Sequence, residues 1–126
     1  YYLLLIPPKK ISTKIIYEKL DKKNYIGNLT EGMEKIKILI DFLKKREFDK
    51  AEEIMFNRLE KPCFEVWKEG KEVIKRAETM LGKRVFLSGS GSCLFSIYRE
   101  KEEAENVKIN FFEDWDFFVV KNYQQP

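Results

Sequence analysis

The apolar positions of the chain begin as an unbroken run. Residues 1–6 read Tyr-Tyr-Leu-Leu-Leu-Ile and are followed by two prolines. A continuous apolar run predicts a strand in the interior of a sheet that is covered on both faces, because a strand with one exposed face alternates apolar and polar residues. A chain that opens inside such a strand is expected to be a piece of a longer protein.

Beyond the prolines, apolar residues recur at spacings of three and four, which predicts helices. Ser12 or Thr13 is placed to cap a short helix that reaches Leu20, because a hydroxyl group accepts a hydrogen bond from an otherwise unpaired backbone N–H group. Residues 21–29 are expected to form a loop, and Gly82 to end the last helix. Between these points we expect three amphipathic helices. The first begins at Thr30 and carries the apolar stripe Met33, Ile36, Leu39, Ile40 and Leu43. The second begins at Asp49 with the stripe Ala51, Ile54, Met55 and Leu59, and the third at Pro62 with Trp67, Ile74, Ala77 and Leu81.

The rest of the chain predicts strands. Residues 85–87 and 93–98 are apolar runs joined by the five residues 88–92, and a connection of this length favours an antiparallel hairpin. A short charged helix is expected over residues 99–106, and a final strand over residues 115–120. This order predicts an α+β fold in a single domain over the whole chain: a ferredoxin-like, mainly antiparallel four-stranded sheet with extra helices in the first crossover.

The composition excludes several chemistries. The 126 residues include no histidine, so the chain alone cannot build a Ser-His-Asp triad, a Cys-His dyad or an H-E-x-x-H metal site. Cys63 and Cys93 lie far apart and neither belongs to a C-x-x-C pair, so a reduced, cytoplasmic protein is expected and a thiolate metal site is not. Glu113, Asp114 and Asp116 suggest a Mg²⁺ site, but a solvated turn accounts for them, and we predict no metal site.

The charges favour neither nucleic acid nor a membrane as a partner. The 24 basic and 21 acidic residues give a net charge of +3 and are interleaved, apart from short basic runs such as residues 44–46 that suit a helix end or a solvated surface. A nucleic-acid surface needs basic residues clustered without acids. The first apolar run is too short to span a membrane, and it lacks the basic start and cleavage site of a signal peptide.

The most informative segment is residues 87–95, Leu-Ser-Gly-Ser-Gly-Ser-Cys-Leu-Phe. Gly89 and Gly91 permit positive φ angles and let backbone N–H groups approach an anion, while the serines add hydroxyl donors. The segment lacks the G-x-x-x-x-G-K-[ST] pattern of a P-loop. From the residues alone, a phosphate-supporting loop and a plain hairpin turn both remain open.

Three segments resemble the GHMP small-molecule kinases. Residues 87–95 are similar to the third, C-terminal glycine-rich motif of that family, in the S-G-S-G-[SA]-C-x-F form of the branch that acts on a diphosphocytidyl sugar alcohol. Residues 2–17 resemble the strand, proline and S-T-x-x-x-[YF] run that opens the family's C-terminal domain. Residues 57–60, Asn-Arg-Leu-Glu, resemble its N-D-L-E signature, with Arg58 replacing the usual acid.

The resemblance implies an ATP-dependent kinase that phosphorylates a sugar-alcohol hydroxyl in the non-mevalonate route to isoprenoid precursors. In this family the N-terminal domain supplies the ATP phosphate loop and the catalytic Asp and Lys, and none of those motifs is present here. The chain is therefore expected to hold no catalytic residue and to be inert alone. Its expected partners are a cytidine diphosphate sugar-alcohol substrate and its own N-terminal kinase domain, which would bind most of the ATP and Mg²⁺.

The resemblance also implies roles for individual residues. Tyr17 matches the aromatic residue that stacks on the substrate's cytosine, whereas periodicity alone favours a partly buried core position for it. The loop residues are expected to face the active site near the phosphates and to act through backbone hydrogen bonds and close approach. The candidate substrate-binding residues are Thr13, Tyr17, Gly89, Ser90, Gly91 and Ser92.

Two alternatives remain open. Another GHMP kinase, of the homoserine or mevalonate type, would share the glycine-rich loop, and the S-T-x-x-x context of Tyr17 is what argues against it. A non-enzymatic ferredoxin-like binding module would use the same glycine-serine segment only as a hairpin turn.

Overall fold

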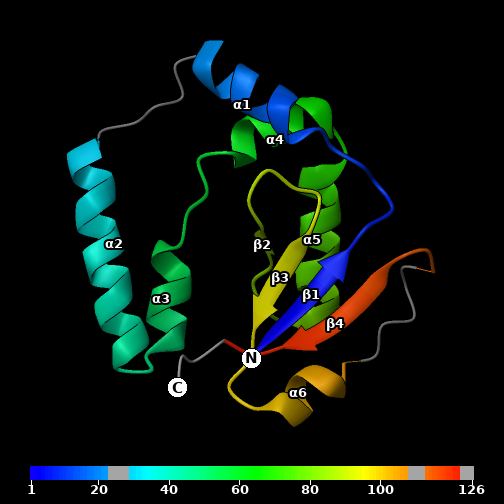
Figure 1. The fold of residues 1–126 in the computed structure, drawn as a ribbon. Helices are drawn as coiled ribbons and strands as arrows, with labels where there is room; N and C mark the ends of the chain where they lie inside the picture. Colours follow the sequence, from blue (N-terminus) through cyan, green and yellow to red (C-terminus); the bar gives the residue numbers. More distant parts are fainter. Residues whose placement is uncertain (23–28, 108–112, 123–126) are drawn as a thin grey trace.

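The computed structural model of the chain describes residues 1–22, 29–107 and 113–122. The elements lie in the predicted order of strand, helices, strand, strand, helix and strand (Figure 1). They are β1 (Tyr2–Ile6), α1 (Thr13–Lys22), α2 (Leu29–Lys44), α3 (Phe48–Ile54), α4 (Glu60–Val66), α5 (Gly70–Leu81), β2 (Phe86–Leu87), β3 (Leu94–Ile97), α6 (Lys101–Glu105) and β4 (Asp116–Val120).

The four strands form one antiparallel sheet in the order β2-β3-β1-β4. Strand β1 lies in the interior, between β3 and β4, as its unbroken apolar run predicts. The alternation of strands with helical crossovers, and the extra helices in the first crossover, confirm the α+β, ferredoxin-like plan.

The core lies between one face of this sheet and the helices α1, α4 and α5. Leu3 and Leu5 of β1 are 1% exposed, and they pack in one cluster with Ile16 of α1, Cys63 of α4 and Ala77 of α5. In Figure 1, α5 crosses behind the strands while α1 and α4 lie above them. Among the described residues, no helix is long and apolar enough to cross a membrane.

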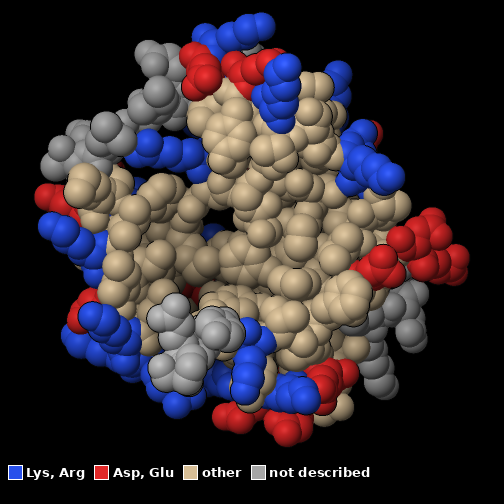
Figure 2. Space-filling model, viewed as in Figure 1, with Lys and Arg blue, Asp and Glu red and all other residues tan. Residues whose placement is uncertain are grey.

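Within residues 1–22, 29–107 and 113–122, helices cover only one face of the sheet, so the cover expected on both faces of β1 is found on one face. Along β1 buried residues alternate with half-buried ones, because the helices of the core cover only one side. The strand register places Phe86, Phe95, Leu4 and Phe118 in one row across the open face. Figure 2 shows this face as a broad area without charged side chains, bordered by basic and acidic groups.

Helix α2 is present as predicted, but its apolar stripe is not buried. It forms a hairpin with α3 beside the β2 edge of the sheet (Figure 1). Met33, Ile36, Ile40 and Leu43 remain 40–61% exposed, and the core cluster of the described residues contains no residue of α2. The spacing of the stripe identifies the helix, but no described element covers the face that the stripe marks.

Where the sequence predicts two helices after α2, the structure has three shorter ones, α3, α4 and α5. Helix α3 begins at Phe48, one residue before the expected cap Asp49, and stops at Ile54. The helix expected from Pro62 onward breaks between α4 and α5. Gly70 is the first residue of α5, and a Cβ atom there would lie 2.8 Å from side-chain atoms of Phe64 and Trp67, so the close approach at this break requires a glycine.

The remaining predicted boundaries lie close to the observed ones. Gly82 ends α5 with a φ of 63°, as expected for a left-handed C-cap. Helix α1 extends to Lys22, and most of the loop expected over residues 21–29 lies outside the described residues.

Candidate functional site

The glycine-serine loop, residues 88–92, connects β2 to β3. Both glycines adopt the predicted positive φ, 55° at Gly89 and 86° at Gly91. A Cβ atom on Gly91 would lie 2.7 Å from Cys63 Sγ and 3.1 Å from Leu87 Cδ1, whereas one on Gly89 would meet nothing within 4 Å. The loop therefore packs tightly against α4 at Gly91 and faces open space at Gly89.

Hydrogen bonds join this loop to the segment that opens α1. Thr13 Oγ1 and Ser90 Oγ are 3.0 Å apart, and the Ser92 hydroxyl donates to the Lys9 carbonyl oxygen. Ser12 caps α1, because its Oγ accepts a hydrogen bond from the Ile15 N–H group at 3.4 Å. The structure thus brings three predicted site residues, Thr13, Ser90 and Ser92, into one exposed cluster.

Tyr17 lies on α1 near this cluster. It follows Thr13 by four residues, so both project from the same side of the helix. Tyr17 is 50% exposed while the neighbouring Ile16 is fully buried. The core position that periodicity favours for Tyr17 is therefore wrong, because α1 packs on the sheet through Ile16 and leaves the tyrosine ring accessible to a ligand.

Asn57 is the residue that sequence reasoning left without a role. Its Nδ2 donates to the carbonyl oxygens of Leu87 at 3.1 Å and Gly89 at 2.7 Å, and its Oδ1 accepts the Leu59 N–H group at 3.0 Å. The hydrogen bond from Leu59 to Asn57 Oδ1 forms an Asx turn just before α4. An asparagine shortly before a helix is the sequence signal for such a turn. Asn57 therefore ties the loop to the start of α4.

Arg58, which replaces the acid of the N-D-L-E pattern, is directed toward α2. Its Nη2 lies 2.9 Å from the position that a Cβ atom on Gly32 would occupy. The side chain therefore packs on α2, while the neighbouring Asn57 binds the loop.

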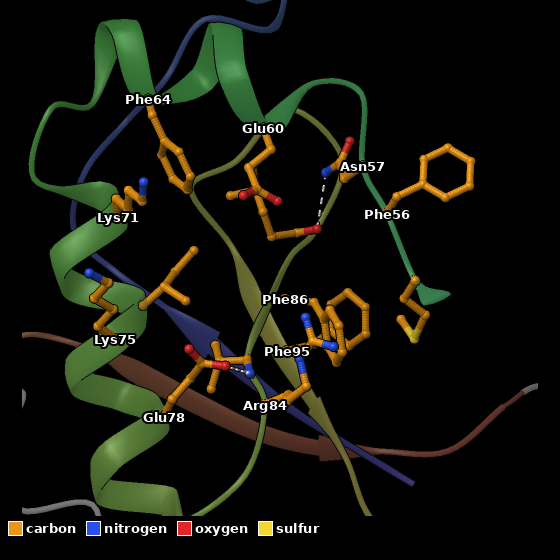
Figure 3. Close-up of a pocket in the computed structure, with 14 residues that line it drawn as sticks. Phe56, Asn57, Glu60, Phe64, Lys71, Lys75, Glu78, Arg84, Phe86 and Phe95 are labelled. Atoms are coloured by element: carbon orange, nitrogen blue, oxygen red, sulfur yellow. Dashed lines mark hydrogen bonds between the residues drawn. The ribbon is translucent and has the colours of Figure 1, made fainter. Parts of the chain in front are cut away.

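A cavity of 230 Å³ lies next to this cluster, between α5, the segment that links α3 to α4, and the outer edge of β2 (Figure 3). Asn57 and Leu87 line both the cavity and the base of the loop. The cavity wall combines aromatic and aliphatic side chains with charged ones from α4, α5 and the start of β2.

The thiols near the loop are protonated at neutral pH. Burial, assisted by the nearby Glu60 carboxylate, raises the pKa of Cys63 from 9.0 to about 11, and burial also raises the pKa of Cys93. A thiol in this state is a poor nucleophile. The chemistry that the loop cluster offers is therefore hydrogen bonding and close backbone approach.

Two comparisons with known proteins found matches to this chain. The family model described as GHMP kinases C terminal matches residues 39–114, which include Asn57 and the glycine-serine loop; Thr13 and Tyr17 precede its first matched residue. The 4-diphosphocytidyl-2-C-methyl-D-erythritol kinase of Thermodesulfovibrio yellowstonii is 33% identical over 131 residues. That match covers 100% of this chain and 44% of the relative, so the chain spans less than half the length of the curated relative it matches.

Proposed function

Because the chain belongs to the family of GHMP kinase C-terminal domains, we propose that it is the substrate-side domain of a kinase acting on 4-diphosphocytidyl-2-C-methyl-D-erythritol. The reaction is ATP-dependent phosphorylation of the 2-hydroxyl group, in the non-mevalonate route to isoprenoid precursors. The observation that carries the proposal is that the loop binds both other family segments: Ser90 contacts Thr13, and Gly89 accepts from Asn57.

In the proposal, this chain binds and orients the diphosphocytidyl substrate. Phosphoryl transfer depends mainly on positioning and on electrostatic stabilisation. The exposed ring of Tyr17 offers a face on which the cytosine stacks. The open side of the loop at Gly89 and the hydroxyl groups of Thr13 and Ser90 lie on the same surface and supply hydrogen bonds to the polar remainder of the substrate.

ATP and Mg²⁺ are assigned mainly to the N-terminal domain of the same kinase. Mg²⁺ prefers oxygen ligands, usually carboxylates together with the phosphates, and among the described residues no group of three acidic or cysteine side chains is placed to hold a metal ion. When bound beside this domain, ATP supplies the phosphoryl group. A cytoplasmic location belongs to the proposal, since free cysteines suit a reducing compartment.

The N-terminal domain is also the partner that we propose for the apolar surface. Phe118 on the open sheet face is 53% exposed and Met33 on α2 is 61% exposed, and a monomeric protein seldom exposes large apolar side chains over so wide an area. More than half the length of the matched relative has no counterpart in this chain. A domain of that size would cover part of this surface.

The test is ADP formation by the full-length protein and by this chain. The full-length protein is expected to form ADP only when the diphosphocytidyl substrate is added, and the 126-residue chain to form none. Turnover by the chain alone would overturn the division of labour. ADP formation with homoserine or mevalonate in place of the diphosphocytidyl compound would assign the protein to another GHMP kinase.

A further inference from the structure

The cavity beside the β2 edge has a largely apolar lining. Its wall includes the buried side chains of Val85 and Leu87 and the side chain of Ile74 on α5. Figure 3 shows the rings of Phe64 and Phe86 on opposite sides of it. Its 230 Å³ exceeds the volume of about 150 Å³ at which an apolar protein cavity takes up benzene. The space therefore accommodates a substituted ring or a short branched chain.

The charges around the cavity favour an anion. Lys71 and Lys75 border it from consecutive turns of α5, and within the described part of the chain neither has an ion-pair partner. Arg84 adds a third positive charge, with Nη1 bound to the Glu52 carbonyl oxygen at 2.8 Å. Three basic side chains therefore face two acidic ones: Glu78, whose Oε2 accepts the Val85 N–H group at 3.2 Å, and Glu60 of α4, which lies near Asn57 (Figure 3). Two lysines without an ion-pair partner among the described residues thus line the α5 side of the cavity.

The cavity shares two residues with the glycine-serine loop. Asn57 lines the cavity and at the same time donates to the Gly89 carbonyl oxygen. Leu87 lines it as well, and its Cδ1 lies 3.1 Å from the position that a Cβ atom on Gly91 would occupy. An occupant that moves the Asn57 or Leu87 side chain must therefore shift contacts of the loop.

We propose that this cavity is a ligand site distinct from the glycine-serine loop, which takes a small molecule with an apolar body and one anionic head group. The apolar body lies against Ile74, Phe64 and Leu87, and the anion lies between Lys71 and Lys75. Occupancy changes the environment of Gly89 through Asn57. Ligand binding in the cavity and its effect on Gly89 are both independent of the kinase activity proposed above.

The test is a titration of the ¹⁵N-labelled 126-residue chain with 4-phenylbutyrate, followed by amide chemical shifts. The neutral 4-phenylbutyramide serves as the matched probe without charge. We expect the carboxylate to shift the amides of Ile74, Leu87 and Gly89, and to bind more tightly than the amide. Shifts confined to α2 and the open sheet face, or equal affinities for the two probes, would overturn the proposal, as would no shift up to the solubility limit.

Three variants separate the parts of the proposal. The double variant Lys71→Gln/Lys75→Gln is expected to bind the carboxylate about three- to tenfold more weakly, whereas Lys37→Gln on α2 leaves its affinity unchanged. Asn57→Ala is expected to abolish the shift at Gly89 and to keep the shift at Ile74. An unchanged affinity in the double variant would show that the two lysines do not bind the anion. A Gly89 shift that persists in a folded Asn57→Ala protein would show that Asn57 does not couple the cavity to the loop.

Discussion

Asn57 Nδ2 donates a hydrogen bond of 2.7 Å to the carbonyl oxygen of Gly89, across 32 residues of sequence. The same amide nitrogen also binds the Leu87 carbonyl oxygen, and the side-chain oxygen accepts from Leu59. One side chain therefore holds the end of β2, the beginning of the glycine-serine loop and the first turn of α4 together. This gives the N-x-L-E segment a physical role that is independent of the residue at position 58.

Asn57→Asp isolates the donor half of this contact. The aspartate can still accept the Leu59 N–H group, but it has no N–H group to donate and places a negative charge beside two carbonyl oxygens. We expect the free energy of unfolding to fall by about 1–3 kcal/mol, measured by urea denaturation. Asn106→Asp at the exposed end of α6 is the matched control, with an expected change within about 0.5 kcal/mol. Equal values for the two variants would contradict the role of Asn57.

The two loop glycines should respond differently to alanine. Both have positive φ, which costs an alanine about 1–2 kcal/mol. Only at Gly91 would the new Cβ atom also collide, 2.7 Å from Cys63 Sγ, so Gly91→Ala is expected to lose about 1–3 kcal/mol more than Gly89→Ala. Urea denaturation of both variants measures the difference. A Gly89→Ala protein that is the less stable of the two would refute the packing of the loop against α4.

Features set by neighbouring residues were predictable from the sequence. The strand β1, the left-handed end of α5 at Gly82 and the β2–β3 hairpin follow from local apolar patterns and turn residues. The sequence also grouped Thr13 with the loop, though only through the family resemblance, because the two segments are 77 residues apart in the chain.

Features set by distant contacts were not predictable. The stripe of α2 defines an amphipathic helix, but a stripe does not say which surface covers it, and Met33 stays 61% exposed. The role of Asn57 depends on carbonyl groups 30 and 32 residues away, and a single sequence carries no local sign of such partners.

Alkaline pH should destabilise the fold through Cys63. The folded chain holds the thiol proton more tightly than the unfolded chain, with a pKa of about 11 against 9.0. The contribution of the thiol to stability is therefore complete below pH 9 and is lost as the pH rises toward 11, by roughly 2–3 kcal/mol. The free energy of unfolding, measured from pH 8 to 11, should fall less steeply in Cys63→Ala than in the unmodified chain. The same slope in both proteins would show that Cys63 does not titrate in this way.

Tyr17 tests the proposed substrate surface. The ring is 50% exposed on the side of α1 that carries Thr13, so replacing it should cost little stability. In the full-length kinase, Tyr17→Ala is expected to weaken binding of the diphosphocytidyl substrate by about 1–3 kcal/mol, the value of one base stacked on an aromatic ring, and to leave the affinity for ATP nearly unchanged. Calorimetric titration with each ligand measures the two effects. Ile15→Ala is the matched control, because Ile15 is 45% exposed on the same helix and should affect neither affinity. Equal losses for substrate and ATP in Tyr17→Ala would mean that the ring supports the fold of the domain and does not bind the base.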